Sequence, residues 1–182
     1  MATKIAINGF GRIGRCVARI LFESGRTDLE LVGINDLTTN DMLAHLLKYD
    51  SVHRTFGPEV TSDDDAITIG GKKVPCFAIK DPAELPWKDL GAEIVLECTG
   101  VFRDREGAGK HLKAGAERVI ISAPGKGVDG TFCVGINTAD YDASKHQVIS
   151  NASCTTNCLA PIAKVVHEQF GIVKGQMVTV HS

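Results

Sequence analysis

A glycine-rich turn at residues 8–14 restricts the fold of this chain more than any other feature. The stretch "NGFGRIG" places Gly9, Gly11 and Gly14 in the G-x-G-x-x-G spacing, between a β-rich run and a helical pattern. In that position Gly9 permits a tight turn, Gly11 lets the backbone approach a pyrophosphate, and Gly14 allows close packing of helix on strand. A glycine-rich turn that binds no ligand is the alternative interpretation.

The residues around this turn predict two parallel strands joined by a helix. "KIAIN" (4–8) is a short strand, the helical pattern starts at Arg12, and "LELVGIN" (29–35) is a second strand. An apolar stripe predicts the buried helix face, and the arginines, Arg19 among them, are expected on the other face. A βαβ unit of this size implies a parallel sheet. The stripe consists of Ile13, Val17, Ile20 and Leu21.

The sequence up to residue 150 continues to alternate between strands and helices. We expect a helix at 40–49 and, at 66–79, a hairpin that lies at the margin of the sheet. A strand at 93–98, a helix at about 104–114, a strand at 118–123 and short strands at 131–134 and 147–149 follow. This order predicts an α/β fold with a doubly wound, mostly parallel Rossmann-type sheet over residues 1–150.

Asp36 follows the second strand, where an acid can accept hydrogen bonds from the ribose of an adenine dinucleotide. A carboxylate there would repel a 2′-phosphate, and Leu37 offers no compensating charge. The sequence therefore predicts NAD rather than NADP as the cofactor.

The alternation of short strands and helices gives way to a longer helical pattern after Asn151. An apolar helical stripe ends at Gly171, Pro161 is expected to kink or restart that helix, and "MVTVHS" (177–182) predicts a strand. We expect residues 151–182 to be the start of a second, α+β catalytic domain that is cut short, and the sequence to be the first part of a longer polypeptide.

Two of the six cysteines lie one helical turn apart, in "SNASCTTNC" (150–158). Cap-type residues before Cys154 place it near a helix N-terminus, where the helix dipole favours a thiolate. Cys158 is expected to be a packed thiol, and the other four are expected to be buried free thiols. Because no further ligands have suitable spacing, we predict no metal site.

His181 is a candidate base for the Cys154 thiol. Strand alternation puts Thr179 and His181 on one face and the valines of "MVTVHS" on the other. A histidine that only makes a structural hydrogen bond remains the alternative.

The overall charge of −2 and the lack of a basic cluster argue against nucleic acid or an anionic membrane surface as a partner. No apolar run reaches transmembrane length, and the N-terminus lacks the layout of a signal peptide. We therefore expect a cytoplasmic protein.

Several motifs together resemble phosphorylating glyceraldehyde-3-phosphate dehydrogenases. They are "KIAINGFGRIGR" (4–15), "IND" (34–36), "HLLKYDSVH" (45–53), "ECTGVF" (97–102), "ISAPGKG" (121–127) and "SNASCTTNCLAP" (150–161). The resemblance implies a homotetramer when the chain is full length, with NAD, an aldehyde phosphate and inorganic phosphate as its small-molecule partners.

The resemblance also implies roles for individual residues. Cys154 would be the nucleophile and His181 the base, while Ser153 and Thr155 would hold the attacking phosphate. The implied cofactor-binding residues are Gly9, Gly11, Arg12, Ile13 and Gly14 at the pyrophosphate, Asp36 at the ribose, Lys80 beside the adenine, and Thr99, Gly100 and Ser122 along the cofactor.

The implied reaction converts glyceraldehyde 3-phosphate to 1,3-bisphosphoglycerate, a step of glycolysis and gluconeogenesis, through a hemithioacetal and a thioester on Cys154. Erythrose-4-phosphate dehydrogenase shares the cysteine motif and is the nearest alternative, although Asp36 and "SAPGKG" favour the glyceraldehyde enzyme. A non-catalytic NAD-binding module is the alternative from another class, above all for the isolated fragment.

Overall fold

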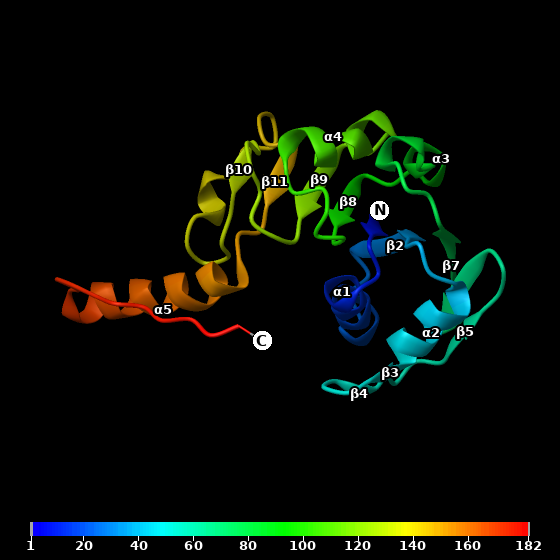
Figure 1. Ribbon diagram of the computed structural model, residues 1–182, viewed down its shortest axis with the longest axis horizontal. Helices are drawn as coiled ribbons and strands as arrows, with labels where there is room; N and C mark the ends of the chain where they lie inside the picture. The colour runs from blue at the N-terminus through cyan, green and yellow to red at the C-terminus, as the bar shows by residue number, and fades with distance from the viewer. Residues whose placement is uncertain (1, 182) are drawn as a thin grey trace.

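The computed structural model describes residues 2–181 and shows a mixed α/β fold around one large sheet (Figure 1). The sheet has nine strands in the order β10-β11-β9-β8-β1-β2-β7-β6-β5. All neighbours from β10 to β7 are parallel, whereas β7-β6 and β6-β5 are antiparallel. The predicted doubly wound, mostly parallel sheet is confirmed, and the predicted hairpin lies at its margin.

The structure contains each element that the sequence predicts up to residue 150, and it adds short strands at 49–50, 54–55 and 60–62 and a short helix at 87–90. The strands are β1 Thr3–Asn8, β2 Leu29–Asn35, β3 Tyr49–Asp50, β4 Arg54–Thr55, β5 Val60–Ser62, β6 Ala66–Ile69, β7 Lys72–Phe77, β8 Ile94–Glu97, β9 Arg118–Ile121, β10 Gly130–Thr131 and β11 Val148–Ser150. The helices are α1 Arg12–Glu23, α2 Asn40–Lys48, α3 Trp87–Leu90, α4 Arg105–Lys113 and α5 Cys154–Phe170, with 3₁₀ turns at Pro82–Glu84 and Thr138–Asp140.

Strand β1 lies at the point where the chain order of the sheet reverses. It pairs with β2 on one side and with β8 on the other. Ile5 and Ile7 belong to a core that also includes Ala18 of α1, while Ala6 belongs to a second core with Trp87. The two faces of β1 therefore pack against different layers. In doubly wound sheets, ligands bind at the carboxyl ends of the strands beside such a reversal.

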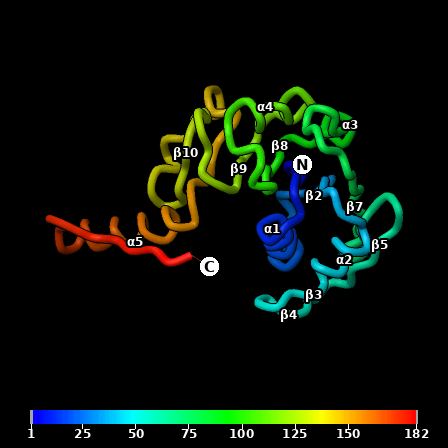
Figure 2. Tube along the Cα trace, in the orientation of Figure 1, coloured from blue at the N-terminus to red at the C-terminus, as the bar shows by residue number. Residues whose placement is uncertain are grey.

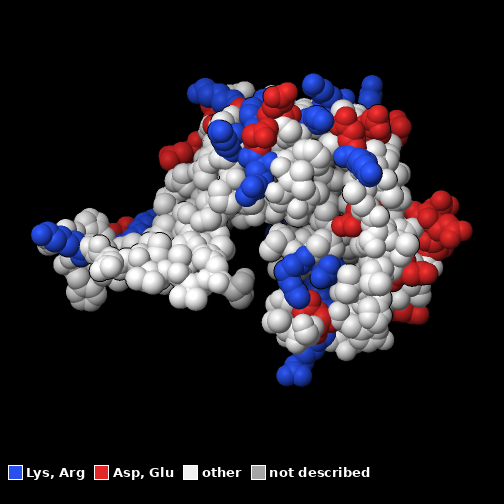
Figure 3. All heavy atoms as spheres, in the orientation of Figure 1, with Lys and Arg blue, Asp and Glu red and all other residues white. Residues whose placement is uncertain are grey.

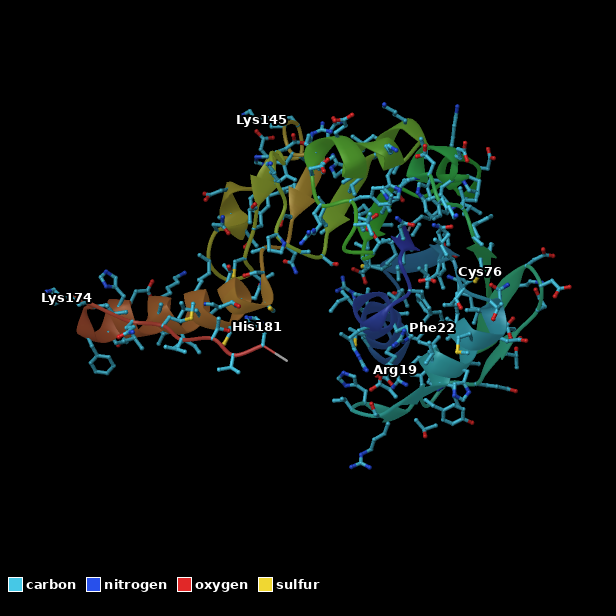
Figure 4. The ribbon with its side chains drawn as sticks, in the orientation of Figure 1. Arg19, Phe22, Cys76, Lys145, Lys174 and His181 are labelled. Atoms are coloured by element: carbon cyan, nitrogen blue, oxygen red, sulfur yellow. The ribbon has the colours of Figure 1, made fainter. Side chains whose placement is uncertain are left out.

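Helix α1 buries only part of the apolar stripe that the sequence predicts, since Val17 and Leu21 pack against the core. Ile13 and Ile20 are exposed, whereas Arg19 is only 5% exposed. Its guanidinium donates to the backbone oxygens of Leu47 and Lys48, at the end of α2, and lies 5.0 Å from the centre of the Phe56 ring. The expectation that Arg19 faces solvent is wrong, because backbone carbonyls accept from both terminal nitrogens of its guanidinium in the interior. Figure 4 shows Arg19 on α1.

Helix α5 and residues 172–181 form an arm that extends from the sheet (Figures 1 and 2). The helix continues through Pro161, so the expected restart is wrong, and Gly171 ends it with φ 74°. Of the strand expected at 177–182, residues 177–181 are irregular, since no described segment pairs with their backbone, and that expectation is wrong there. Ser182 lies outside the described residues. An isolated strand leaves its backbone groups without partners, which favours irregular structure.

The apolar side chains of this arm lie largely at the surface. Ile162, Phe170 and Val173 are exposed, Phe170 by 85% and Val173 by 93%. Figure 3 shows a mostly uncharged surface over the arm, in contrast to the charged surface over α4 and β5. The expectation that Cys158 is packed is wrong, because the residue is exposed and an open cavity separates it from the returning segment 177–181.

The six cysteines are free thiols, as expected. Cys133 is buried, and Cys16, Cys76 and Cys98 are only partly buried. Among the described helices, none is long and apolar enough to cross a membrane.

Asp104 caps α4, since its carboxylate accepts a hydrogen bond of 2.7 Å from the backbone N–H of Gly107. We expect Asp104→Ala to lower the free energy of unfolding by about 1 kcal/mol, because an N–H of the first turn loses its acceptor. Asp104→Asn keeps an acceptor and should retain most of the stability. Urea denaturation measures both, and equal losses in the two variants would contradict the capping role.

Candidate functional site

A cavity of about 410 Å³ opens at the carboxyl ends of the central parallel strands. It combines the segments that follow β1, β2, β7 and β8, which lie far apart in the sequence but end at one edge of the sheet. Its lining residues are Asn8, Gly9, Gly11, Asn35, Asp36, Leu37, Ile79, Lys80, Cys98, Thr99, Val101 and Phe102. Five of the residues proposed from the sequence for the cofactor are therefore brought together here: Gly9, Gly11, Asp36, Lys80 and Thr99.

The glycines of the turn allow distances that no side chain would tolerate. A Cβ on Gly14 would lie 2.3 Å from the oxygen of Gly9, and a Cβ on Gly9 would lie 2.6 Å from the backbone nitrogen of Thr99. Gly9 also has φ +91°, which favours glycine. Gly11 differs, because nothing lies within 4 Å of its Cβ position. Two glycines thus serve packing, and the third faces open space at the cavity.

The first turn of α1 has no side-chain cap, so the backbone N–H groups of Arg12, Ile13 and Gly14 are not engaged by a capping side chain. Uncapped N–H groups and the positive end of the helix dipole make such a terminus suitable for an anion. Arg12 forms an ion pair with Asp50, and backbone hydrogen bonds, led by that from His53, lower the pKa of the Asp50 carboxyl to about 2.

Asp36 is held at the rim of the cavity by backbone donors. One carboxylate oxygen accepts from the N–H of Phe10 at 2.7 Å, and the other accepts from the N–H of Thr38 at 3.2 Å. The carboxylate therefore links the end of β2 to the glycine turn after β1. Leu37 beside it is exposed and uncharged.

Two further residues proposed for the cofactor lie near the cavity without lining it. Gly100, between two lining residues, has φ +74°, which permits the turn after β8. The N–H of Ser122 donates to the backbone oxygen of Glu97 at 3.0 Å. Burial raises the pKa of the neighbouring Cys98 thiol to about 11.

Sequence reasoning missed the polar residues that end the central strands. Asn8 and Asn35 line the cavity and are almost fully buried. The available signal was an asparagine as the last residue of each of the two strand-like runs. Ile79, Val101 and Phe102 carry no such signal, because apolar residues next to strands are equally typical of a core.

Cys154 is the first residue of α5, which confirms its predicted place near a helix N-terminus. Ser153 is the N-cap, and its hydroxyl accepts a hydrogen bond of 2.9 Å from the N–H of Thr156. The Cys154 thiol is exposed, and its sulfur lies 3.9 Å from the hydroxyl of Thr155. The positive end of the helix dipole therefore adjoins an accessible sulfur.

A second cavity, of about 300 Å³, brings Cys154 and His181 together. The other lining residues are Thr155, Cys158, Leu159, Ile162, Met177, Val178 and Thr179. Residues 172–181 run back along α5, and Figure 4 shows His181 on this returning segment. Nε2 of His181 lies 3.0 Å from the hydroxyl of Thr179, so these two polar side chains lie close together. The predicted strand alternation is not confirmed, because the segment is irregular and Val178 lines the same cavity.

The segment that leads into α5 is fixed by hydrogen bonds of Ser150 and Asn157. The Ser150 hydroxyl donates to the oxygen of Ala123 and accepts from the N–H groups of Gly125 and Ala152. Ala152 has φ 58°, a conformation that residues other than glycine rarely adopt. The amide of Asn157 donates to the backbone oxygens of Asn151 and Ser153. From the sequence, Ser150 and Asn151 are identified only as cap-type residues, and these hydrogen bonds are not predicted.

The parallel sheet, the glycine turn and the cavity at the strand reversal define a dinucleotide-binding domain of the Rossmann class. Comparison with known families makes this more specific. Residues 3–105 match the family model "Glyceraldehyde 3-phosphate dehydrogenase, NAD binding domain", and residues 153–182 match "Glyceraldehyde 3-phosphate dehydrogenase, C-terminal domain". The chain belongs to the glyceraldehyde-3-phosphate dehydrogenase family, and it contains the NAD-binding domain and the start of the C-terminal domain.

Curated relatives agree with this assignment. The chain is 56% identical to a glyceraldehyde-3-phosphate dehydrogenase of Thermotoga maritima over 98% of its length and 54% of the relative's. It is 56% identical to that of Geobacillus stearothermophilus, over 100% and 54% of the two lengths, and 52% identical to glyceraldehyde-3-phosphate dehydrogenase 2 of Nostoc sp., over 98% and 53%. The chain thus spans about half the length of the curated relatives it matches.

The cysteines should differ sharply in their reactivity. We expect iodoacetamide at pH 8 to alkylate the exposed Cys154 and Cys158 within minutes. Cys76 and Cys98 should stay unmodified, because burial raises the pKa of each thiol to about 11 and the thiolate is the reactive form. Peptide mass spectrometry over a time course measures all four sites. Alkylation of Cys98 as fast as that of Cys154 would contradict the structure.

Proposed function

We propose that the whole protein catalyses the NAD-dependent oxidation and phosphorylation of glyceraldehyde 3-phosphate to 1,3-bisphosphoglycerate. The observation that carries the proposal is Cys154, which lies exposed at the start of α5 and in one cavity with His181. A nucleophilic thiol at a helix N-terminus, with a base nearby, is the arrangement that covalent catalysis requires. Membership of the family supports the choice of substrate.

The larger cavity fits NAD in its chemistry. The uncapped start of α1 can take a pyrophosphate, with Arg12, Ile13 and Gly14 supplying backbone N–H groups, and the open side of Gly11 lets the phosphates approach. Asp36 can accept from the ribose hydroxyls, while Lys80 and Thr99 line the same space. Gly100 and Ser122 complete the proposed set. When bound, NAD supplies the acceptor for a hydride.

The residues of the smaller cavity can perform the covalent steps. The Cys154 thiolate would attack the aldehyde carbon, and His181 would accept the proton of the resulting hemithioacetal hydroxyl as hydride leaves. The product is a thioester on Cys154. Ser153 and Thr155 flank the nucleophile and would orient inorganic phosphate, which attacks the thioester, releases the acyl phosphate and restores the thiolate. The division into two steps conserves the energy of oxidation in the thioester.

Two other functions remain as alternatives. Erythrose-4-phosphate dehydrogenase would use the same thiol, and a comparison of kcat/KM for the two aldehydes distinguishes the activities. A module that binds NAD without catalysis would need no accessible thiol, so the exposed sulfur of Cys154 disfavours it.

We further propose that the whole protein is a cytoplasmic homotetramer that acts on small molecules. We also propose that residues 1–150 and 151–182 belong to separate domains.

Asp36 should determine the choice between NAD and NADP. We expect NADP to bind about tenfold or more weakly than NAD, since the 2′-phosphate would face this carboxylate. Asp36→Asn removes the charge but keeps an acceptor for the N–H of Phe10. This variant should bring the ratio of the NADP and NAD dissociation constants closer to one. Isothermal calorimetry measures both cofactors. Asp28→Ala, at the opposite end of β2, is the control and should leave the ratio unchanged.

Cys154→Ala should separate cofactor binding from catalysis. In the whole protein we expect turnover to fall by at least about 10⁴-fold, because no nucleophile remains, with NAD affinity unchanged. Cys158→Ala removes the other exposed thiol of α5 and should keep turnover within a few-fold. Initial rates with glyceraldehyde 3-phosphate, NAD and phosphate test both variants. Normal turnover of Cys154→Ala would overturn the assignment of the nucleophile.

A further inference from the structure

Three neighbouring strands end in polar side chains that form a row beneath the larger cavity. The register of the sheet pairs Asn8 of β1 with Asn35 of β2 on one side and with Glu97 of β8 on the other. All three are nearly inaccessible: Asn8 and Glu97 are 1% exposed and Asn35 is 5% exposed. Glu97 does not line the cavity, whereas both asparagines do.

The Glu97 carboxylate accepts four hydrogen bonds. One oxygen accepts from Nδ2 of Asn8 at 2.6 Å and from Nε2 of His111 at 3.0 Å. The other accepts from the N–H of Thr99 at 2.8 Å and from the Thr99 hydroxyl. Because all four partners donate, both oxygens act purely as acceptors, which is the pattern of an ionised carboxylate.

The tautomer of His111 follows from its other partner. Nδ1 of His111 lies 2.9 Å from Nε1 of Trp87, and both rings are completely buried. An indole N–H can only donate, so Nδ1 must be the acceptor and the ring proton must lie on Nε2. His111 is therefore a neutral donor to Glu97, and its orientation is fixed by the single tryptophan of the chain.

The row also holds the segment that follows β7. Nδ2 of Asn35 donates to Oδ1 of Asn8 at 2.7 Å and to the backbone oxygen of Ile79 at 2.9 Å. The N–H of Ile79 donates back to Oδ1 of Asn35 at 2.9 Å. Ile79 and Lys80 form one wall of the cavity. Hydrogen bonds therefore connect this wall to Asn35, Asn35 to Asn8, and Asn8 to Glu97.

On the other side, Glu97 holds the turn that follows β8. The Thr99 hydroxyl, which donates to Glu97, also accepts from the N–H of Val101 at 3.0 Å. The backbone of Thr99 lies against Gly9, where a Cβ would come within 2.6 Å of the Thr99 nitrogen. The distance between the glycine turn and the 99–102 wall therefore depends on where Glu97 places Thr99.

We propose that Glu97 is the positioning residue of the cofactor cavity. It acts through Asn8 and Thr99 to fix the glycine turn and the walls at 79–80 and 98–102, and it does so without contacting the ligand. The inference rests on the proposed binding of NAD in this cavity. Glutamine cannot replace glutamate here, because its amide would point a donor at partners that all donate.

The first experiment measures NAD dissociation constants by isothermal calorimetry for wild type and Glu97→Gln. We expect a rise of about tenfold or more, as for the loss of hydrogen bonds to a buried charge. Glu84→Gln removes the same charge at an exposed position and is the matched control, with an expected change within about twofold. The alkylation rate of Cys154 should stay unchanged in both variants, because its turn is fixed by Ser150 and Asn157. Unchanged NAD affinity in folded Glu97→Gln overturns the proposal.

The second experiment needs no cofactor and does not require Glu97→Gln to fold. Thr99 lies in a surface turn, and Thr99→Val removes the hydrogen bond that its hydroxyl donates to Glu97. The Glu97 carboxylate should then shift, and His111, which donates to it, should shift as well. The indole N–H of Trp87 gives one resonance in a ¹⁵N spectrum, and we expect it to move in Thr99→Val. Thr61→Val, an exposed threonine of β5, is the control and should leave it in place.

The two experiments separate the inference from the proposed function. An indole resonance that is identical in wild type and Thr99→Val would overturn the coupling through Glu97, whatever the cofactor affinity. Failure of the wild-type protein to bind NAD would instead overturn the proposed function, and the indole measurement would still decide whether Glu97 organises the cavity walls. The alkylation rate of Cys154 serves as a check on the folded Glu97→Gln variant. If this variant loses NAD affinity and its Cys154 is also alkylated at a different rate from wild type, the defect is a general structural one. That result would overturn a specific positioning role for Glu97.

Discussion

The close approach of α1 and β8 to the end of β1 is the constraint on which the rest of the site depends. The backbone at Gly14 and Gly9 comes so near to its neighbours that a Cβ at either position would overlap another backbone. This contact points the uncapped start of α1 at the edge of the sheet where the order of the strands reverses. The cavity, the acid at its rim and the buried polar row all lie around that point.

Local patterns predicted the parts of the fold that local physics determines. The glycine turn requires particular backbone conformations, and the strand before it and the helix after it follow from periodicity over a few residues. The cap-type residues before Cys154 placed it at a helix start for the same reason. Asp36 could be identified because its place follows from the end of one strand, without knowledge of what surrounds it.

The remaining features depend on contacts between distant segments. Glu97 and His111 meet across a strand and a helix, and neither has a local pattern that indicates a buried pair. Helical periodicity assigned Arg19 to a solvated face, but carbonyls from another part of the chain accept hydrogen bonds from its guanidinium. Cys158 and residues 174–181 depend on what covers or pairs with them, which helical and strand periodicity do not specify.

Two of the three arginines of α1 have a mechanical consequence for the surface hairpin β3-β4. Arg12 pairs with Asp50 of β3, and Arg19 donates to the carbonyl oxygens of Leu47, just before the hairpin, and of Arg54 in β4. The hairpin is thus fastened to the helix at two points about two turns apart. It must rotate or translate together with α1, so an anion that pulls on the first turn of this helix would also move a loop on the protein surface.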